Sequence, residues 1–400
     1  MSAQAAERPI PDSDLVPALA RGIDEAGYAV FRAAASETEN TAVSPSSIGL
    51  AFGMADAGAS GQVSLAIEQT FALPGEGDER LAAFNAYEQR LAIAPGTKGE
   101  DADGHEVELP MVTIANKVFT DTAFTPSVEY VETVQRWFGA DAQSIPLRTD
   151  PGAAADTMND WISDQTNGLI KDLYDADSFS DASRLELLNA LYMKAQWRDE
   201  LTPEHTQDWG FTRLDGSRVE VPMMNATVTA SGAMQGDGYV AGALAYAGDA
   251  LEMVVIVPDE GRFAEVRDRL DPALMEEIDA GWSPSAAFTV LVPRFEAATR
   301  VDLRDVMEDT MGIEGLFDTE GLDGIAPDLV IGSAIHATKV IVDEEGTEAA
   351  AVTGIGVEAA GAMVPAESID VVAERPFLYV IRDIDTGASL FVGQVLDPTA

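Results

Sequence analysis

Apolar residues recur along this chain with two different periods. In the first half they recur every three to four positions, which predicts amphipathic helices over Leu15–Ala35, Ser47–Met54 and Asp156–Leu173. Ser44 and Pro45 suit the N-cap and first turn of the second helix. In the second half, short apolar runs predict strands at 185–193, 219–224, 251–258, 288–292, 330–342, 377–382 and 390–395. Because helices lead and strands follow without regular alternation, we expect an α+β fold with largely antiparallel sheets.

The most informative stretch is residues 344–360, which alternates like a strand but is rich in alanine and glycine. If it is extended, the face that carries Thr347 is uncharged, whereas Glu348 and Glu358 both lie on the opposite face. Glycine and alanine are poor strand formers. Strand-like alternation combined with poor strand formers suits a segment that is a mobile loop in one state and a buried strand in another.

Residues Asp343–Ala351, read Asp-Glu-Glu-Gly-Thr-Glu-Ala-Ala-Ala, resemble the hinge of the reactive-centre loop of serpins, the suicide inhibitors of serine proteases. Further segments resemble the family in its own order, at 40–61, 114–119, 159–171, 187–197, 221–224, 293–295 and 375–398. The resemblance runs from about residue 15 to the end. It implies one serpin domain over 1–400, with residues 1–14 flexible, three β-sheets, about nine helices and an exposed reactive-centre loop over about 344–374. The main sheet is then expected to have five strands and to accept a sixth.

The resemblance also assigns roles to individual residues. It implies a loop hinge made of Glu344, Glu345, Gly346, Thr347, Glu348, Ala349, Ala350, Ala351 and Val352. It implies a polar shutter under the centre of the main sheet, made of Ser44, Ser47, Asn189 and His336. Trp197 and Arg294 match the breach, where insertion begins, and Arg294 is expected to form an exposed ion pair with Glu344. Such exposed pairs contribute only ~0–1 kcal/mol to stability.

Family spacing from Gly346 places the scissile bond between Ala360 and Gly361. The stretch that follows is a few residues longer than in most serpins, so Ala359, Ala362 and Met363 are alternatives. None of these residues is basic, which argues against trypsin-like targets and favours elastase-, subtilisin- or chymotrypsin-like proteases. The implied activity is inhibition by loop cleavage, acyl-enzyme formation, insertion into the main sheet and trapping of the protease. Val352 is bulkier than is usual in the family, but it is expected to point outward.

The net charge of −45 restricts the possible partners. Only five lysines stand beside nineteen arginines, and such a chain repels itself unless salt screens its charges. We therefore expect an acidic protein of the halophilic type, adapted to molar salt. Nucleic acid and anionic membranes are excluded because binding them requires a basic face. The basic patch that heparin-binding serpins carry has no counterpart here, so a polyanion cofactor is not expected.

Motifs for catalysis or cofactor binding are missing. His105-Glu106 begins like a zinc-protease motif, but Leu109 stands where the second histidine belongs. Neither a Gly-x-Ser-x-Gly elbow nor a phosphate-binding glycine loop occurs, and the chain contains no cysteine. We therefore expect no enzymatic activity, no metal and no cofactor.

The resemblance also implies a partner and a compartment. The partner is a serine protease held covalently by a monomer. The extracellular space is favoured by the resemblance, although the start lacks the apolar stretch of a signal peptide, and the cytoplasm is the alternative. Two other functions stay open, a non-inhibitory chaperone or binding protein of the same fold, and a salt-tolerant scaffold whose acidic surface is its function.

Overall fold

The computed structural model describes residues 8–100, 106–199, 201–228, 232–282, 288–317, 319–331, 334–347 and 369–400. Within these ranges eight α-helices occur: α1 (Val16–Ala34), α2 (Pro45–Asp56), α3 (Gly61–Thr70), α4 (Gly77–Leu91), α5 (Val128–Phe138), α6 (Pro151–Gln165), α7 (Phe263–Arg269) and α8 (Pro272–Gly281). Three short helical turns accompany them: η1 (Ala176–Ser178), η2 (Pro203–His205) and η3 (Asp305–Thr310). None of the described helices is long and apolar enough to cross a bilayer.

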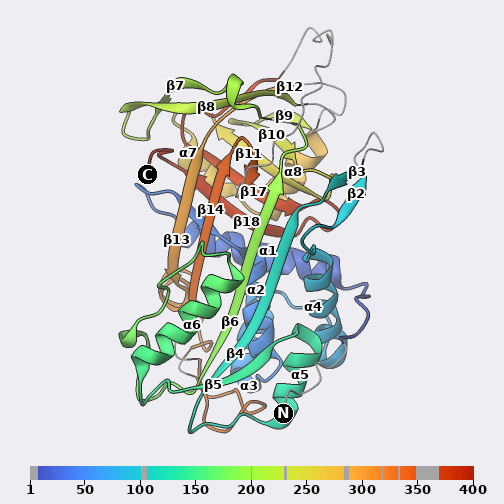
Figure 1. Cartoon of the computed structure of the whole chain (residues 1–400), viewed down its shortest axis with the longest axis vertical. Helices are drawn as coiled ribbons and strands as arrows, with labels where there is room; N and C mark the ends of the chain where they lie inside the picture. The colour runs from blue at the N-terminus through green and yellow to red at the C-terminus, as the bar shows by residue number, and fades with distance from the viewer. Residues whose placement is uncertain are drawn as a thin grey trace.

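The main sheet runs along the long axis of the molecule (Figure 1). Its strand order is β13-β14-β15-β6-β4-β5, and only β4 and β5 are parallel. The members are β13 (Phe295–Asp302), β14 (Ile335–Asp343), β15 (Gly346–Thr347), β6 (Leu185–Gln196), β4 (Met111–Asp121) and β5 (Asp141–Ile145). Two residues of the sixth strand, Gly346 and Thr347, are described, so the five-stranded sheet predicted from the sequence already contains the first part of an inserted strand.

Two further sheets and a hairpin complete the fold. The second sheet is antiparallel and contains β1 (Thr41–Val43), β18 (Ser389–Val395), β17 (Phe377–Asp383), β11 (Leu251–Pro258), β10 (Tyr239–Ala245) and β9 (Ala233–Gly236). The third contains β16 (Val371–Val372), β12 (Phe288–Pro293), β8 (Arg218–Val228) and β7 (Gln207–Thr212). The hairpin pairs β2 (Lys98–Glu100) with β3 (Glu106–Glu108). The α+β class and the three large sheets expected from the sequence are confirmed.

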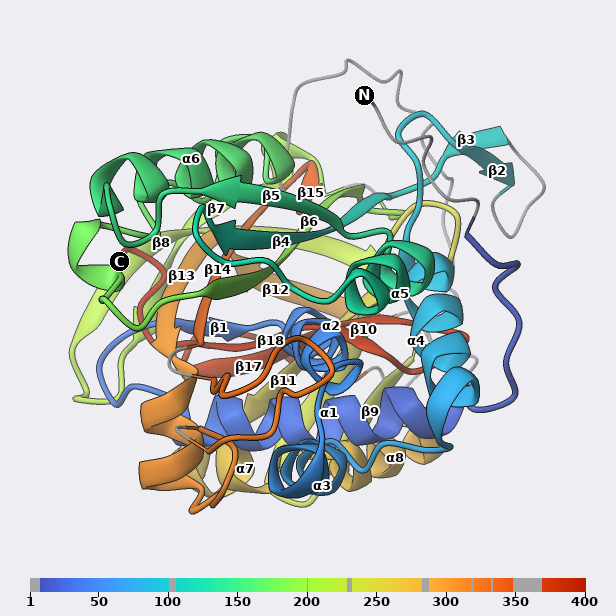
Figure 2. The same ribbon diagram turned by 90° about the horizontal axis from the view of Figure 1, so that it is seen from below.

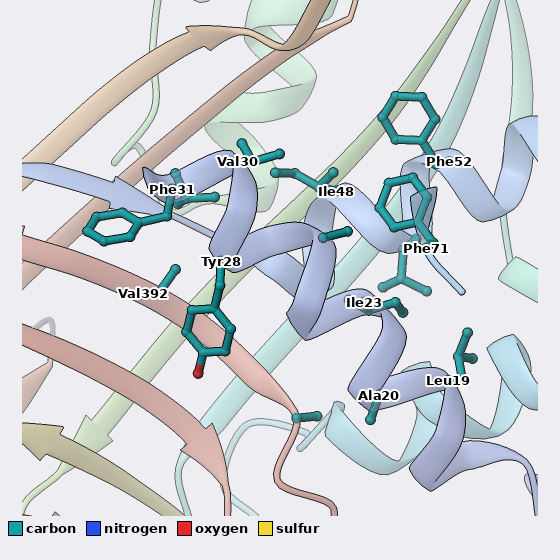
Figure 3. Packing of buried hydrophobic residues seen from close by; sticks show 14 of the residues in the cluster. Leu19, Ala20, Ile23, Tyr28, Val30, Phe31, Ile48, Phe52, Phe71 and Val392 are labelled. Carbon is teal, nitrogen blue, oxygen red and sulfur yellow. The ribbon is translucent and has the colours of Figure 1, made fainter. Parts of the chain in front are cut away.

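Helices cover both faces of the main sheet, with α6 on one side and α2 on the other (Figure 2). The core beneath the sheet is built around α1, whose side chains meet those of α2, Phe71 and Val392 in one cluster (Figure 3). A second cluster fills the space between the upper main sheet and the other two sheets, and a third lies under α6. Burying these apolar faces is the main favourable contribution to folding.

The helical periods locate α1 and α2 closely, and Ser44 caps α2 by accepting a hydrogen bond from the Ser47 amide. The prediction for α6 is wrong at both ends, because the helix covers Pro151–Gln165 instead of Asp156–Leu173. Asp150 caps its start through its carboxylate. Asn167 and Gly168 then adopt positive φ angles of 51° and 79°, a conformation that ends a helix. The predicted strand 330–342 is also shorter, beginning at Ile335.

Candidate functional site

The hinge enters the main sheet directly after β14. The chain turns at Glu344–Glu345, and Gly346 and Thr347 then pair with Asp343 and Val342 on one side and with Gln196 and Ala195 on the other. Gly346 has a φ of 135°, and a Cβ atom there would lie 1.8 Å from the Ala195 carbonyl oxygen. Only glycine fits this position. The rest of the predicted hinge (Glu348, Ala349, Ala350, Ala351, Val352) and the scissile candidates Ala359–Met363 lie outside the described residues.

A bidentate ion pair fixes the base of the hinge. Arg294 donates to both carboxylate oxygens of Glu344, at 2.7 and 2.6 Å, and the Thr206 hydroxyl donates to the same carboxylate. The expected partner is therefore present, but the expectation of an exposed pair was wrong for the acid, since the Glu344 side chain is 6% exposed and that of Arg294 is 47%. Burial alone would raise the pKa of Glu344, but the hydrogen bonds from Arg294 and Thr206 hold it below its ordinary value.

Two aromatic rings lie above the inserted residues. The indole of Trp197 stacks on the Tyr246 ring, with 4.6 Å between the centroids, and donates from Nε1 to the Asp343 carbonyl at 2.9 Å. The Tyr246 hydroxyl in turn lies 2.6 Å from the Thr347 hydroxyl. Trp197 thus holds the turn that precedes the hinge, and Tyr246 contacts the hinge itself. Sequence reasoning missed Tyr246, because a tyrosine at the end of an apolar run gives no local signal beyond burial.

In the described part of the main sheet, a gap lies between β6 and β14 below Thr347. Among the described residues β6 and β14 share no ladder pair, because β15 separates them at the top and each pairs with another strand on its far side. A cavity of about 10 Å³ lies beside Thr347, and a larger one of about 50 Å³ lies further down. We call the gap between β6 and β14, from Thr347 down to Asn189 and His336, the seam. Both cavities are lined by residues of both strands.

Three of the four predicted shutter residues form one cluster at the lower end of the seam. The Ser44 amide donates to Nε2 of His336 at 3.0 Å, and the Thr338 hydroxyl lies 2.8 Å from the same nitrogen. Ser47 joins through the cap of α2, its amide donating to Ser44 Oγ. Burial lowers the pKa of His336 to about 4, so the ring is neutral near pH 7. Thr338 was not predicted, although it lies on the same strand face as His336.

Asn189 faces the same cavity but belongs to a different hydrogen-bonded chain. Its Nδ2 donates to Asn116 Oδ1 at 2.8 Å, and Asn116 donates to Glu88 and to the Phe138 carbonyl. The Asn189 Oδ1 atom is buried and has no partner among the described residues. A buried acceptor without a donor costs about 1–3 kcal/mol. The lower seam therefore contains a cavity and a buried acceptor. A polar side chain that entered between β6 and β14 would occupy the cavity and could donate a hydrogen bond to Asn189 Oδ1.

Comparison with known proteins gives a consistent result over nearly the whole chain. The model of the Serpin (serine protease inhibitor) family matches residues 22–398. Mouse (Mus musculus) neuroserpin is 28% identical over 90% of this chain and 87% of its own length. Serpin-Z2A of wheat (Triticum aestivum) is 31% identical over 91% of each chain. The crystal structure of Serpin48 from the insect Tenebrio molitor superposes with a TM-score of 0.81 at 22% identity, over 97% of this chain and 100% of that one.

Proposed function

Because this chain belongs to the serpin family, we propose that it is a suicide inhibitor of serine-type endopeptidases. The observation that carries the proposal is the pairing of Gly346 and Thr347 between β14 and β6, at the top of a seam in which these two strands share no ladder pair among the described residues. An insertion that has already begun needs only a free downstream end to continue. Strand addition of this kind is a known way to release stored strain.

The chemical step is supplied by the protease. Its serine oxygen attacks the carbonyl carbon of the scissile residue, which we assign to Ala360, and the bond to the Gly361 nitrogen breaks as that nitrogen takes up a proton. The inhibitor is then bound to the protease through an ester. Water would normally hydrolyse this ester, and the trap works only if insertion of the loop displaces the protease first. The intact molecule must therefore be kinetically trapped above a more stable inserted state.

The register of the hinge specifies how the insertion would proceed. Thr347 lies opposite Val342 and Ala195. Continued for six residues, this register brings Thr353 opposite both His336 and Asn189. Thr347 and Thr353 lie on the same strand face, which faces the core. The Thr353 hydroxyl would then enter the cavity of about 50 Å³ and donate to the unpartnered Asn189 Oδ1. Insertion would thus bring a donor to an acceptor that has no partner among the described residues.

The small or unbranched residues 359–363 favour elastase-, subtilisin- or chymotrypsin-like targets. The charge of −45 favours a working environment of high salt, and we propose the halophilic type on that basis. We further propose that the protein acts extracellularly as a monomer without a cofactor. The alternative function is a non-inhibitory chaperone or binding protein of the same fold.

The test is incubation of the full chain with subtilisin and elastase in molar salt, followed by denaturing electrophoresis and the mass of the released C-terminal peptide. An inhibitor gives a detergent-resistant adduct, and the peptide mass identifies the scissile bond. The Thr347→Arg variant should be cleaved without forming the adduct, because Thr347 is buried and an arginine there would stop insertion. Nicking the loop should also raise the melting temperature of the wild type sharply. Cleavage without an adduct and without added heat stability would favour the non-inhibitory alternative.

A further inference from the structure

The segment that precedes α1 is tied to α4 by an unusually dense set of contacts. Arg8 forms a bidentate pair with Glu88, at 2.8 and 3.1 Å, and donates to the Trp137 carbonyl at 2.9 Å. The Pro9 carbonyl accepts hydrogen bonds from Asn85 and Gln89, each at 3.2 Å. We call residues 8–10 the N-terminal strap. It runs beside α4, at the far edge of the molecule from the C-terminus (Figure 2).

Glu88 is a buried carboxylate that depends on the strap. It is 4% exposed, and among the described residues Arg8 is the one cation that pairs with it. Burial raises the pKa of Glu88, and the hydrogen bonds and charge of Arg8 oppose that shift. Removing one partner of a buried ion pair leaves an uncompensated charge, which is far more costly than never having had the pair. Glu88 must then gain a proton, draw in water or move.

Glu88 is also the first link in a chain that ends at the seam. Asn116 donates to Glu88 Oε2 at 3.1 Å and accepts from Asn189 Nδ2 at 2.8 Å. Asn116 and Asn189 are ladder partners on β4 and β6, and Asn189 lines the cavity between β6 and β14. Four consecutive side chains, from the strap, α4, β4 and β6, therefore connect the surface with the place where the sheet must part. If Glu88 moves, Asn116 loses the acceptor of one of its hydrogen bonds, and the Asn116 side chain that accepts from Asn189 can then shift.

We propose that the N-terminal strap, through Arg8, Glu88, Asn116 and Asn189, holds β4 and β6 in place and so sets the rate at which the main sheet opens. Arg8 is a positioning residue in this proposal, since it acts through other side chains. Loss of Arg8 frees the lower part of β6 and lowers the barrier to loop insertion. The effect on inhibition rests on the proposed function, whereas the effect on β6 does not.

The test is amide hydrogen exchange of the full chain, followed by mass spectrometry on peptides that cover β6. In Arg8→Ala the amides around Asn189 should exchange about tenfold faster, which corresponds to about 1.4 kcal/mol. Arg21→Ala is the matched control, because it removes the same charge from a pair whose side chains are 53% and 62% exposed. It should leave exchange in β6 unchanged. The double variant Arg8→Ala/Glu88→Gln should return toward the wild-type rate, since a neutral amide needs no guanidinium and still accepts from Asn116.

Two outcomes would overturn the proposal. One is equal exchange in Arg8→Ala and Arg21→Ala, which means that the strap does not affect β6. The other is faster exchange that Glu88→Gln does not correct, which means that the effect bypasses the chain of side chains. Neither outcome involves a protease. If no variant forms an adduct while exchange still follows the expected order, the suicide-inhibitor function fails and the strap proposal stands.

Discussion

The hydroxyl groups of Tyr246 and Thr347 lie 2.6 Å apart inside the molecule, although 100 residues separate them in the chain. Tyr246 follows β10 of the second sheet, whereas Thr347 is the last described residue of the hinge. The contact joins a fixed part of the fold to the segment that the proposed mechanism must move. It indicates that the intact molecule already stabilises the inserted part of the hinge at Thr347.

The first prediction concerns this contact. Tyr246→Phe removes one hydroxyl from a buried pair and should lower the free energy of unfolding by about 1 kcal/mol, measured by urea unfolding. Tyr379→Phe is the matched control, because the Tyr379 hydroxyl is buried without a partner among the described residues. That substitution should leave the free energy of unfolding unchanged. Equal losses in both variants would show that the Thr347 contact does not stabilise the hinge.

The second prediction concerns the pair that fixes the hinge base. Arg294→Ala leaves the Glu344 carboxylate buried with Thr206 as its remaining side-chain donor and should destabilise the protein by about 1–3 kcal/mol near pH 7. The pKa of Glu344 is lowered in the folded state, so the pair contributes stability above pH 4.5 that is lost as the pH falls through the folded value. The difference between wild type and variant should therefore shrink in acid. A constant difference from pH 7 to pH 3 would contradict this account.

A third prediction follows from the neutral His336. Its pKa falls from 6.5 to about 4 on folding, because burial disfavours the charged ring. Between these values the unfolded chain binds a proton that the folded protein does not, so stability decreases as the pH drops from 6.5 to about 4. The loss is at most about 3.4 kcal/mol, since one pKa unit corresponds to about 1.36 kcal/mol. His336→Gln should remove this part of the pH dependence, as urea midpoints at pH 7 and pH 5 will show. If stability falls with pH equally in the variant and in the wild type, His336 is not the group responsible for the loss.

The fourth prediction tests the register of insertion. Thr353→Val keeps the shape of the side chain but removes the hydroxyl that we place against Asn189 in the inserted state. The loop-nicked variant should be about 1 kcal/mol less stable than the nicked wild type, measured in concentrated denaturant. The intact proteins provide the control, since the contact is proposed only for the inserted form. Ile355→Val changes a residue on the same strand face but outside the polar cluster. Its loss of stability in the nicked form should not exceed the usual cost of removing one buried methylene group.

The fifth prediction concerns salt. With a net charge of −45, repulsion among carboxylates should be strong at low ionic strength and largely screened at 1 M, where the Debye length is about 3 Å. The melting temperature should therefore rise steeply between 0.1 and 2 M potassium chloride in scanning calorimetry. Sucrose, which adds no ions, serves as the control for general exclusion effects. A melting temperature that does not change with the potassium chloride concentration would argue against adaptation to salt.

Local signals in the sequence located some parts of this molecule well. Helical spacing and a Ser-Pro cap located α1 and α2, because periodicity and capping act within one or two turns. The α6 boundaries were missed because positive φ angles at Asn167 and Gly168 end the helix, while the apolar spacing continues past them. The hinge motif was recognisable as a run of residues, but its partial insertion was not.

Short segments of the chain are enough to predict the α+β class, the hinge motif and the residue types of the polar cluster. The burial of Glu344, the contact between Tyr246 and Thr347, and the chain from Asn189 to Glu88 and Arg8 instead of to His336 are visible only in the folded molecule. Each of these contacts joins segments far apart in the chain. Their formation depends on how the sheets and helices pack against one another, and no local pattern of residues encodes that packing.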